Sequence, residues 1–344
     1  MSQNALPPRA SGKTAPKSGK GKKKKRPVLR VLLSLMLVVL VVVALYLGNI
    51  VKKAGDALDT SSTVDNVTVP AAESVKKKAV GIVLLGMDTR PKGGTMNTDV
   101  MMVAVFNPNT KTATVVSMPR DTLIELDGYK ERKANSYYAN FYNQAIEEKG
   151  LSKDAAKEDA RQAMSRMMSK YYGIDIKYTG IINFQGFVDV VDALHGIKAD
   201  VDINMRYVDT ADGTNINLKK GVQTLNGQQT LDFVRYRKSN DGSNMSSDFD
   251  RNQRESQVLS LITDKMKSLN GVTKLGDVIE AVGKNFSIDM PSNEMQNMLK
   301  TYFGISSSDI TLIQLEGTWK SPYVYLDESK LDEARAALQA KMAE

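Results

Sequence analysis

Three short apolar runs constrain the fold of this chain more than any other feature. They cover residues 80–85, 100–106 and 111–118, are rich in Val, and are bounded by Gly, Pro and Asn. Runs of this length and composition predict β-strands. The turn signal at Asn107–Thr110 predicts that the second and third strands form a hairpin.

Charged residues follow each of these predicted strands. If Phe106 pairs with Lys111, Asp99 falls opposite Met118 and next to Arg120, and the first strand ends at the same edge. We therefore expect five charged side chains to converge there, namely Asp88, Arg90, Asp99, Arg120 and Asp121. Carboxylates suit Mg²⁺ and guanidinium groups suit phosphate oxygens, so the pattern predicts a metal and phosphate site. The alternative is that these are surface charges at strand ends.

Composition excludes several classes of site. The chain has 344 residues, of which 42% are hydrophobic, enough for a substantial core in one large domain or two. It has no Cys, which excludes disulfides and thiolate metal sites. Its single His, His195, excludes multi-histidine metal sites and argues against a Ser-His-Asp triad. Because His195 precedes Gly196 at the end of an apolar helical pattern, we interpret it as a helix C-terminal residue.

The net charge of +8 is concentrated at the N-terminus. Residues 1–30 carry ten Lys or Arg and no acidic residue, which leaves about −2 for the rest of the chain. The main part of the protein therefore lacks the basic surface expected of a nucleic-acid-binding protein.

The same N-terminal region predicts a membrane anchor. We expect residues 1–28 to form a disordered basic tail, 29–50 a transmembrane signal anchor, 51–78 an extracytoplasmic linker and 79–344 the folded domain. The basic run Lys22–Arg26 before the apolar segment places the N-terminus in the cytoplasm and the domain outside the membrane. A cleaved signal peptide and, for the basic run, a nuclear-localisation or nucleic-acid-binding tail are the alternatives.

The rest of the domain alternates helical and strand patterns. Helices are expected at 137–146, 152–172, 184–194 and 327–343, and strands at 178–183, 197–203 and 310–315. This alternation predicts an α/β layered domain. The aromatic residues of the first helix are interpreted as core, with the wall of a lipid groove as the alternative.

Two further arginine-rich segments precede the C-terminal region. A helix that starts within Leu225–Gln229 leads to Arg235 and Arg237, which both reach one ligand if the helix ends near Arg235. A second helix begins near Asp250, its expected N-cap, and carries Arg251 and Arg254 in its first turn. A helix N-terminus with two arginines suits an anionic group, although solvated first-turn charges are the alternative.

Six ordered motifs between residues 79 and 270 resemble the LytR-CpsA-Psr (LCP) family. They are Gly86–Arg90, Thr98–Asp99, Ser117–Thr122, Lys133–Asn135, Leu225–Gln228 with Arg235–Arg237, and Asp250–Arg251 with Arg254. The resemblance implies an α/β fold with α-β-α layers, a central mixed sheet and a groove for a polyprenyl chain. It also implies an extracellular, membrane-anchored phosphotransferase of a Gram-positive-type bacterium. Such an enzyme moves wall teichoic acid or a capsular polysaccharide from a polyprenyl-pyrophosphate carrier to peptidoglycan.

The resemblance also assigns roles to individual residues. Asp88 and Asp99 would hold Mg²⁺ (or Mn²⁺), and the pyrophosphate would be held by Arg90, Arg120, Arg235 and Arg237, with Lys133 and Arg254 as secondary contacts. Arg251 joins the expected pyrophosphate-binding residues from its place at the helix N-terminus. For the reaction itself we expect Arg120 to stabilise the transferring phosphate and Asp88 or Asp121 to accept the proton of the attacking hydroxyl. Two positions depart from the family pattern: Glu255 replaces a usual Gln, and His195 replaces the first Gly of a usual Gly-Gly pair.

Three other functions remain open on the sequence alone. A hydrolase would use the same site with water as the acceptor. A membrane-bound transcriptional attenuator would need a cytoplasmic basic domain. A non-catalytic wall-binding protein would leave the clustered Asp and Arg residues without a role.

Overall fold

The computed structural model describes most of the chain after residue 55. The described residues are 56, 59–64, 68–87, 96–211, 213–267, 285–302 and 305–344. The chain divides into units of residues 1–49 and 50–344, and all described residues belong to the second. The predicted tail (1–28) and transmembrane anchor (29–50) lie outside them. Within the described ranges, no helix is both long enough and apolar enough to cross a membrane.

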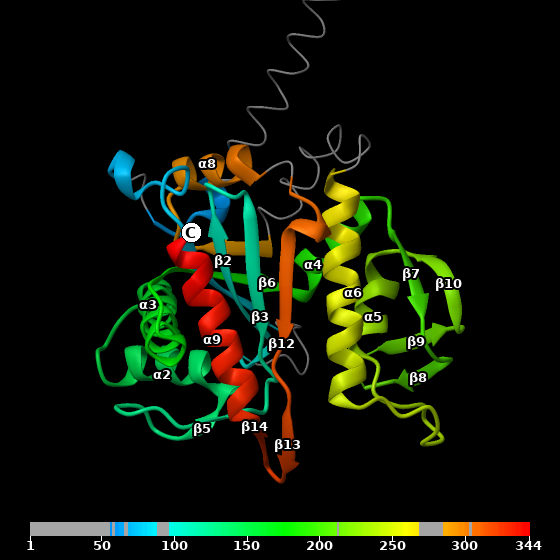
Figure 1. The fold of residues 1–344 in the computed structure, drawn as a ribbon. Helices are drawn as coiled ribbons and strands as arrows, with labels where there is room; N and C mark the ends of the chain where they lie inside the picture. Colours follow the sequence, from blue (N-terminus) through cyan, green and yellow to red (C-terminus); the bar gives the residue numbers. More distant parts are fainter. Residues whose placement is uncertain are drawn as a thin grey trace, which may run out of the picture. The chain divides into compact units, whose positions relative to one another are not determined.

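A six-stranded mixed sheet forms the centre of the described unit (Figure 1). Its strand order is β11-β6-β1-β2-β3-β12. β1 pairs antiparallel with β2 and parallel with β6, and β3 pairs parallel with β12. The bounds are β1 Val80–Met87, β2 Thr98–Asn107, β3 Thr112–Ser117, β6 Ile176–Asn183, β11 Phe286–Ile288 and β12 Ile310–Gln314. The predicted central mixed sheet is confirmed, with β11 as an addition.

The register of the β2–β3 hairpin differs from the prediction by two residues. Phe106 pairs with Ala113 rather than with Lys111. Lys111 belongs to the turn, where its φ is 54°, so the chain reverses later than the turn signal indicated. The same register, continued past the paired residues, places Asp99 opposite Arg120. The shift therefore brings these two side chains closer than predicted, and because it is an even number of residues it preserves the face of each side chain.

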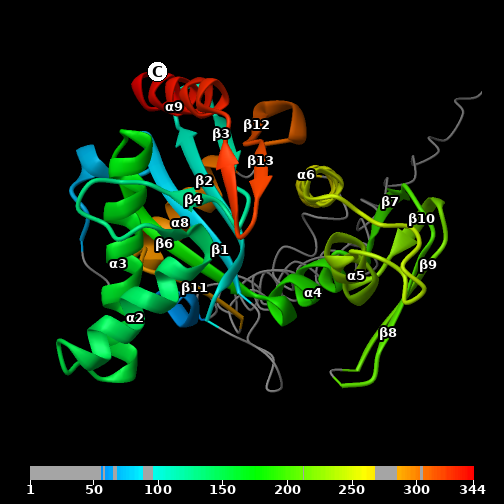
Figure 2. The ribbon, with the colours of Figure 1, turned by 90° about the horizontal axis from the view of Figure 1, so that it is seen from below.

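Three helices cover one face of the sheet (Figures 1 and 2): α2 (Tyr137–Glu147), α3 (Lys153–Tyr172) and α9 (Glu328–Ala343). α3 begins after Ser152, whose Oγ accepts a hydrogen bond from the N–H of Ala155, and ends at Gly173 with φ 67°. The three helices share one buried cluster with the odd-numbered residues of β1; it includes Val83, Leu85, Met87, Tyr137, Tyr138, Met164, Met167, Met168 and Leu338. The aromatic residues of α2 are therefore core, and the lipid-groove alternative for them is wrong.

The other face of the sheet carries α4 (Phe184–Ala193), α5 (Gly227–Arg235), α6 (Asp248–Lys267) and α8 (Ser292–Tyr302) (Figures 1 and 2). Two small sheets pack with α5 and α6, β7 with β10 and β8 with β9, and only β7 was predicted. Their bounds are β7 Ile197–Val201, β8 Met205–Asp209, β9 Thr214–Leu218 and β10 Gly221–Leu225. With helices on both faces, the α-β-α layering is confirmed.

The remaining short elements lie near the ends of the main strands. They are η1 Ala71–Glu73, β4 Leu123–Ile124, β5 Arg132–Lys133, η2 Ala134–Ser136, η3 Ser307–Asp309, β13 Gly317–Lys320 and β14 Tyr323–Leu326. β4 pairs with β5 and β13 pairs with β14. The region after residue 315 therefore contains a hairpin where only helices were expected.

The second half of the predicted linker, 51–78, packs onto the domain. Ser74 Oγ and the N–H of Val75 both donate to the carboxylate of Glu294 on α8, at 2.9 and 2.8 Å. Val75 is buried with α8 side chains in a small cluster. The folded unit thus begins before the predicted boundary at residue 79, because this segment is held by long-range contacts that its local sequence does not encode.

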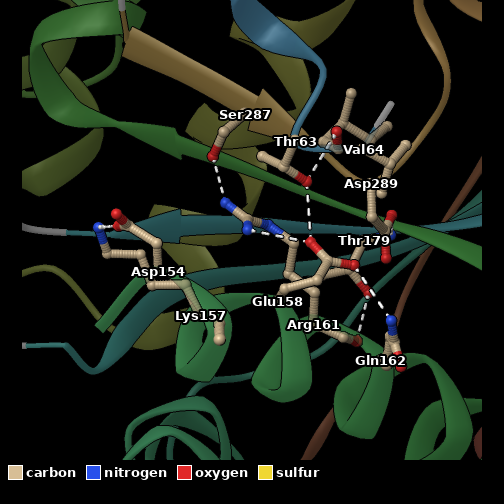
Figure 3. Close-up of polar contacts among 12 residues, drawn as sticks. Thr63, Val64, Asp154, Lys157, Glu158, Arg161, Gln162, Thr179, Ser287 and Asp289 are labelled. Carbon is tan, nitrogen blue, oxygen red and sulfur yellow. Dashed lines mark hydrogen bonds and ion pairs between the residues drawn. The ribbon is translucent and has the colours of Figure 1, made fainter. Parts of the chain in front are cut away.

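A buried arginine joins α3 to its neighbours (Figure 3). Arg161 donates to Ser287 Oγ at 2.6 Å and lies 3.5 Å from the carboxylate of Glu158. Thr63 Oγ1 donates to the same carboxylate at 2.9 Å. These contacts fix α3, β11 and the segment before the sheet relative to one another, which is a structural role.

Candidate active site

A large apolar cavity of about 780 Å³ lies against one face of the central sheet. Side chains alternate along a strand, so residues two apart share a face. The floor of the cavity uses the face opposite the α2–α3–α9 core: Leu84, Gly86, Val100, Met102, Gly180 and Ile182. Its walls come mainly from α4, α5 and α6 and include Phe184, Phe187, Leu231, Val234, Val258 and Leu259. A mainly apolar lining of this size suits a hydrocarbon ligand.

A second cavity of about 500 Å³ is lined almost wholly by polar side chains. Its lining consists of Asn97, Asp99, Arg120, Asp121, Arg132, Lys133, Asn135, Ser136 and Tyr323. Asp99 and Arg120 line both cavities and so mark the point where they meet. A molecule with an apolar tail and a charged head group fits this arrangement if the head group lies at Arg120.

Arg120 lies between two carboxylates at this junction. Its Nη1 donates to Asp99 Oδ1 at 2.6 Å, and its Nε is 3.4 Å from Asp121 Oδ2. Lys133 Nζ is 2.9 Å from Asp121 Oδ1. Within the described residues, the buried Nε of Arg120 makes no hydrogen bond, and its contact with Asp121 is an ion pair. The predicted convergence of Asp99, Arg120 and Asp121 is confirmed, and Lys133 joins them.

Three more arginines reach the apolar cavity from the opposite wall: Arg235, Arg237 and Arg251. α5 starts with a capping box between Asn226 and Gln229 and ends at Arg235. Tyr236 then adopts an extended conformation, with φ −60° and ψ 131°. The predicted condition for both arginines to face one ligand is therefore met.

These guanidinium groups lie close enough to repel one another. Burial is the main cause that lowers the pKa of Arg251, to about 10, and repulsion from the neighbouring Arg237 and Arg120 contributes to that value. Burial also lowers the pKa of Arg237, with Arg120 as the next cause. All remain charged at neutral pH, so an anion placed among them relieves the repulsion. Multiple phosphate oxygens match such a cluster of planar donors.

Arg254 lies away from both cavities. Its Nε and Nη2 donate to the carboxylate of Asp202 at 2.8 and 2.6 Å, and its Nη1 donates to Ser246 Oγ and to the carbonyl of Tyr236. The side chain is 3% exposed. Arg254 therefore anchors the segment that carries Arg235 and Arg237. Its expected role as a secondary pyrophosphate contact stays a prediction, because Arg254 lines neither cavity.

The start of α6 also differs from the prediction. The helix begins at Asp248, and Ser247 rather than Asp250 caps it: Ser247 Oγ accepts the N–H of Asp250 at 3.1 Å. Asp250 returns the contact, accepting the N–H of Ser247 at 2.7 Å. The predicted cap was wrong because Asp250 occupies the third position of a reciprocal capping pair.

Glu255 faces the apolar cavity one helical turn after Arg251. Burial raises its pKa to about 7, Arg251 opposes that rise, and Asp99 adds to it. Near neutral pH this carboxyl therefore exchanges between a neutral and an anionic form beside the arginine cluster.

Asp88 and Arg90 lie outside the described residues. Within the described ranges, no group of three or more His, Asp or Glu side chains forms a metal site. Among the described residues, Asp99 is the carboxylate that lines both cavities, and Mg²⁺ is commonly held by one or two carboxylates together with substrate phosphates. The donor chemistry at Asp99 therefore fits a magnesium ion that a phosphorylated ligand completes.

Sequence reasoning missed two contributors to the site. The guanidinium carbon of Arg235 lies 4.8 Å from the ring centroid of Phe184, which orients that arginine at the cavity mouth. Tyr323 lines the polar cavity from the β13–β14 hairpin. Aromatic residues flank the turn at Ser321-Pro322 in the sequence, and this turn signal would have revealed the hairpin.

His195 takes no part in either cavity. It is exposed and follows α4 with φ 58°, and Gly196 follows with φ 76°. The predicted helix-terminal position is confirmed. The replacement of Gly by His therefore affects a backbone turn that lines neither cavity.

Comparison with known proteins agrees with this site. A profile of the LytR_cpsA_psr (LytR-CpsA-Psr, LCP) family matches residues 42–340. The chain belongs to this family. The resemblance inferred from the six sequence motifs is thereby confirmed.

Several relatives of the chain are named as teichoic acid transferases. The chain is 28% identical over 325 residues to TagV of Bacillus subtilis, covering 90% of this chain and 78% of TagV, and that protein is named a polyisoprenyl-teichoic acid–peptidoglycan teichoic acid transferase. It is 30% identical over 286 residues to TagU of Bacillus mycoides, which carries the same transferase name, with 81% and 84% of the two chains covered.

Solved LCP structures share the fold. The crystal structure of B. subtilis TagV matches with a TM-score of 0.59 at 26% identity, covering 78% of this chain and 98% of that one. A structure of TagT bound to LI-WTA matches with a TM-score of 0.55 at 26% identity, covering 81% and 100%.

Proposed function

We propose that this LCP protein transfers a glycopolymer from a polyprenyl-pyrophosphate carrier to a hydroxyl of peptidoglycan. The observation that carries the proposal is the meeting of an apolar and a polar cavity at Asp99 and Arg120, with three further arginines around the junction. The TagU and TagV relatives are named for this reaction with teichoic acid, and the chain matches most of their length.

The substrate fits the site in one orientation. The polyprenyl chain fills the apolar cavity, where transfer of its methylenes out of water supplies binding energy. The pyrophosphate lies among Arg120, Arg235, Arg237 and Arg251, and the glycopolymer extends from the junction. Lys133 contributes positive charge from the polar side, and Arg90 is assigned to the same anion from the family motif.

The reaction is a displacement at the phosphorus that carries the glycopolymer. The acceptor hydroxyl oxygen forms a bond to this phosphorus, the bond to the bridging pyrophosphate oxygen breaks, and polyprenyl phosphate leaves with the electron pair. Asp121, which lines the polar cavity, accepts the hydroxyl proton. Arg120 and its neighbours stabilise the charge that develops on the phosphate oxygens.

Magnesium is assigned to Asp99, together with Asp88 from the family motif. When bound, the ion supplies charge stabilisation on the pyrophosphate oxygens. Asp99 also holds Arg120 at 2.6 Å, so the same carboxylate orients the arginine that faces the reacting phosphate.

The proposal includes the placement of the protein. Residues 29–50 anchor the chain in the membrane of a Gram-positive-type bacterium with the N-terminus in the cytoplasm. The catalytic domain then lies on the extracellular side, where peptidoglycan is present and the lipid carrier is reached from the bilayer.

The full chain with a synthetic polyprenyl-pyrophosphate glycan tests this function. We expect Mg²⁺-dependent release of polyprenyl phosphate with the glycan attached to added peptidoglycan, and loss of both products in Arg120→Ala. Arg206→Ala is the matched control, since Arg206 is an exposed arginine on β8. Release without attachment in the presence of acceptor would instead support the hydrolase, and lipid binding without release would support a binding protein.

A further inference from the structure

The β13–β14 hairpin exposes an aromatic side chain that packing does not require. Trp319, the single Trp of the chain, is 53% exposed. All four residues of β13 are exposed, so this strand buries nothing in the core. The Trp319 ring therefore offers a large amphipathic contact area to a ligand or partner.

This hairpin is bonded directly to the segment that carries the reactive groups. The N–H of Val324 donates to the carbonyl of Asp121 at 2.9 Å, and Thr122 bridges to Val324. Tyr323, at the start of β14, lines the polar cavity. The hairpin is therefore held at a fixed position relative to Arg120 and Asp121.

Trp319 reaches the same cavity through Lys133. The Lys133 Nζ lies 5.7 Å from the Trp319 ring centroid and 2.9 Å from Asp121 Oδ1. The ring of Tyr325, in contrast, pairs with Lys320 at 5.4 Å. Two aromatic residues of the hairpin are thus associated with the polar cavity. Tyr323 lines its wall, and Trp319 lies beside Lys133, which lines it as well.

Displacement geometry determines which substrate meets this hairpin. In a phosphoryl transfer the attacking and leaving oxygens lie roughly in line on opposite sides of the phosphorus. The leaving polyprenyl phosphate belongs to the apolar cavity, so the attacking hydroxyl arrives from the polar cavity. The hairpin stands on that acceptor side.

We propose that Trp319 and Tyr323 form a docking surface for the glycan strand of the peptidoglycan acceptor, which rests on the proposed function. The C–H faces of pyranose rings pack against aromatic rings, which supply large contact area at low entropic cost. The amides and hydroxyls of N-acetylated amino sugars match the donors and acceptors of the polar cavity, namely Asn97, Arg132, Asn135 and Ser136. The surface orients one acceptor hydroxyl toward Asp121.

Intrinsic fluorescence tests this surface directly, because Trp319 is the only tryptophan. The full chain is titrated with a peptidoglycan tetrasaccharide of alternating N-acetylglucosamine and N-acetylmuramic acid, without the lipid donor. We expect a saturable blue shift of the emission as the sugar covers the ring. An emission spectrum that does not change at tetrasaccharide concentrations supporting transfer would overturn the proposal.

Acceptor kinetics provide the second test. Trp319→Ser is expected to raise the KM for the acceptor roughly tenfold, as for a truncated interface aromatic, while kcat and the KM for the lipid donor stay unchanged. Trp319→Tyr should restore most of the acceptor KM. The control is Val222→Ser, which removes an equally exposed apolar side chain (62%) on β10.

The outcomes separate this inference from the proposed function. An unchanged acceptor KM in Trp319→Ser contradicts the docking surface, and a rise in the donor KM alone assigns the hairpin to the donor glycan instead. If the wild-type chain transfers nothing while the emission still shifts with the tetrasaccharide, glycan docking stands and the transferase function fails.

Discussion

The two cavities of this LCP domain differ in chemistry although they share Asp99 and Arg120. The apolar cavity is built from alternate sheet residues and three helices, all parts of the layered core. The polar cavity is built from strand ends, short β-pairs and the β13–β14 hairpin. Under the proposed function, this difference assigns the apolar cavity to the leaving lipid part of the donor and the polar cavity to the acceptor.

The largest expected effect comes from the residue common to both cavities. Arg120→Ala should lower the transfer rate by on the order of 10²–10³-fold, because it removes a donor aimed at the reacting phosphate. The melting temperature should change little, since Arg120 is 30% exposed. Both quantities are measured on the same preparation.

Arg120→Lys sharpens this test. It keeps the positive charge but not the planar pair of donors, so we expect most of the activity to be lost. Wild-type activity in the Ala variant would remove Arg120 from the mechanism.

A charge introduced into the apolar cavity should act on the donor alone. Met102→Glu places a carboxylate on the cavity floor and is expected to raise the donor KM roughly 30-fold, because an unpaired charge opposes binding of a hydrocarbon chain. The acceptor KM should remain unchanged. Val208→Glu, on the exposed surface of β8, is the control. Equal changes in the donor KM and the acceptor KM of Met102→Glu would contradict separate binding of donor and acceptor in the two cavities.

Removing the hydrogen bonds of Arg254 should destabilise the folded domain. Arg254→Ala should lower the free energy of unfolding by about 2–3 kcal/mol, because it removes charged hydrogen bonds and leaves the Tyr236 carbonyl without this donor. Chemical denaturation measures the change. Lys330→Ala, which breaks an exposed ion pair with Glu333, should cause no measurable change.

The smallest expected effect concerns the pH dependence of donor binding. With a pKa of about 7, Glu255 is neutral below pH 7 and anionic above it. The donor KM should therefore rise roughly threefold to tenfold between pH 6 and pH 8, since the carboxylate repels the pyrophosphate. Glu255→Gln should make the donor KM independent of pH over this range, and a persistent rise in that variant would assign the effect to another group.

Glu255 should also make the folding stability depend on pH. The folded-state pKa lies above the ordinary value of 4.5, so the unfolded chain releases this proton first as pH rises. Stability should fall between about pH 4.5 and 7 for this reason, and Glu255→Gln should reduce the slope of the melting temperature in this window.

Local patterns predicted most of the sheet and its helices. Val-rich runs, the Gly173 helix end and the short α5 helix before Arg235 each have a strong local signal, and all are confirmed. Their order along the chain sufficed to bring Asp99, Arg120 and Asp121 together. The predicted register was two residues off because Lys111 adopts a left-handed turn conformation that the sequence does not require.

What the sequence did not predict depends on contacts between distant segments. Arg254 looks like a ligand-binding residue in the first turn of a helix, and only the position of Asp202, more than 50 residues earlier, directs it elsewhere. The segment at Ser74–Val75 is ordered by Glu294, again a long-range contact. The β13–β14 hairpin has weak strand patterning and gains its place from bonding to Asp121.

The stereochemistry at phosphorus tests the central claim most directly. A lipid donor with a chiral phosphorothioate at the transferring phosphorus is given to the full chain with the peptidoglycan tetrasaccharide, and the configuration of the product is determined. Direct in-line attack from the polar cavity, with the lipid phosphate leaving into the apolar cavity, predicts inversion. Retention of configuration would show two successive displacements through a protein-bound intermediate and would contradict the account.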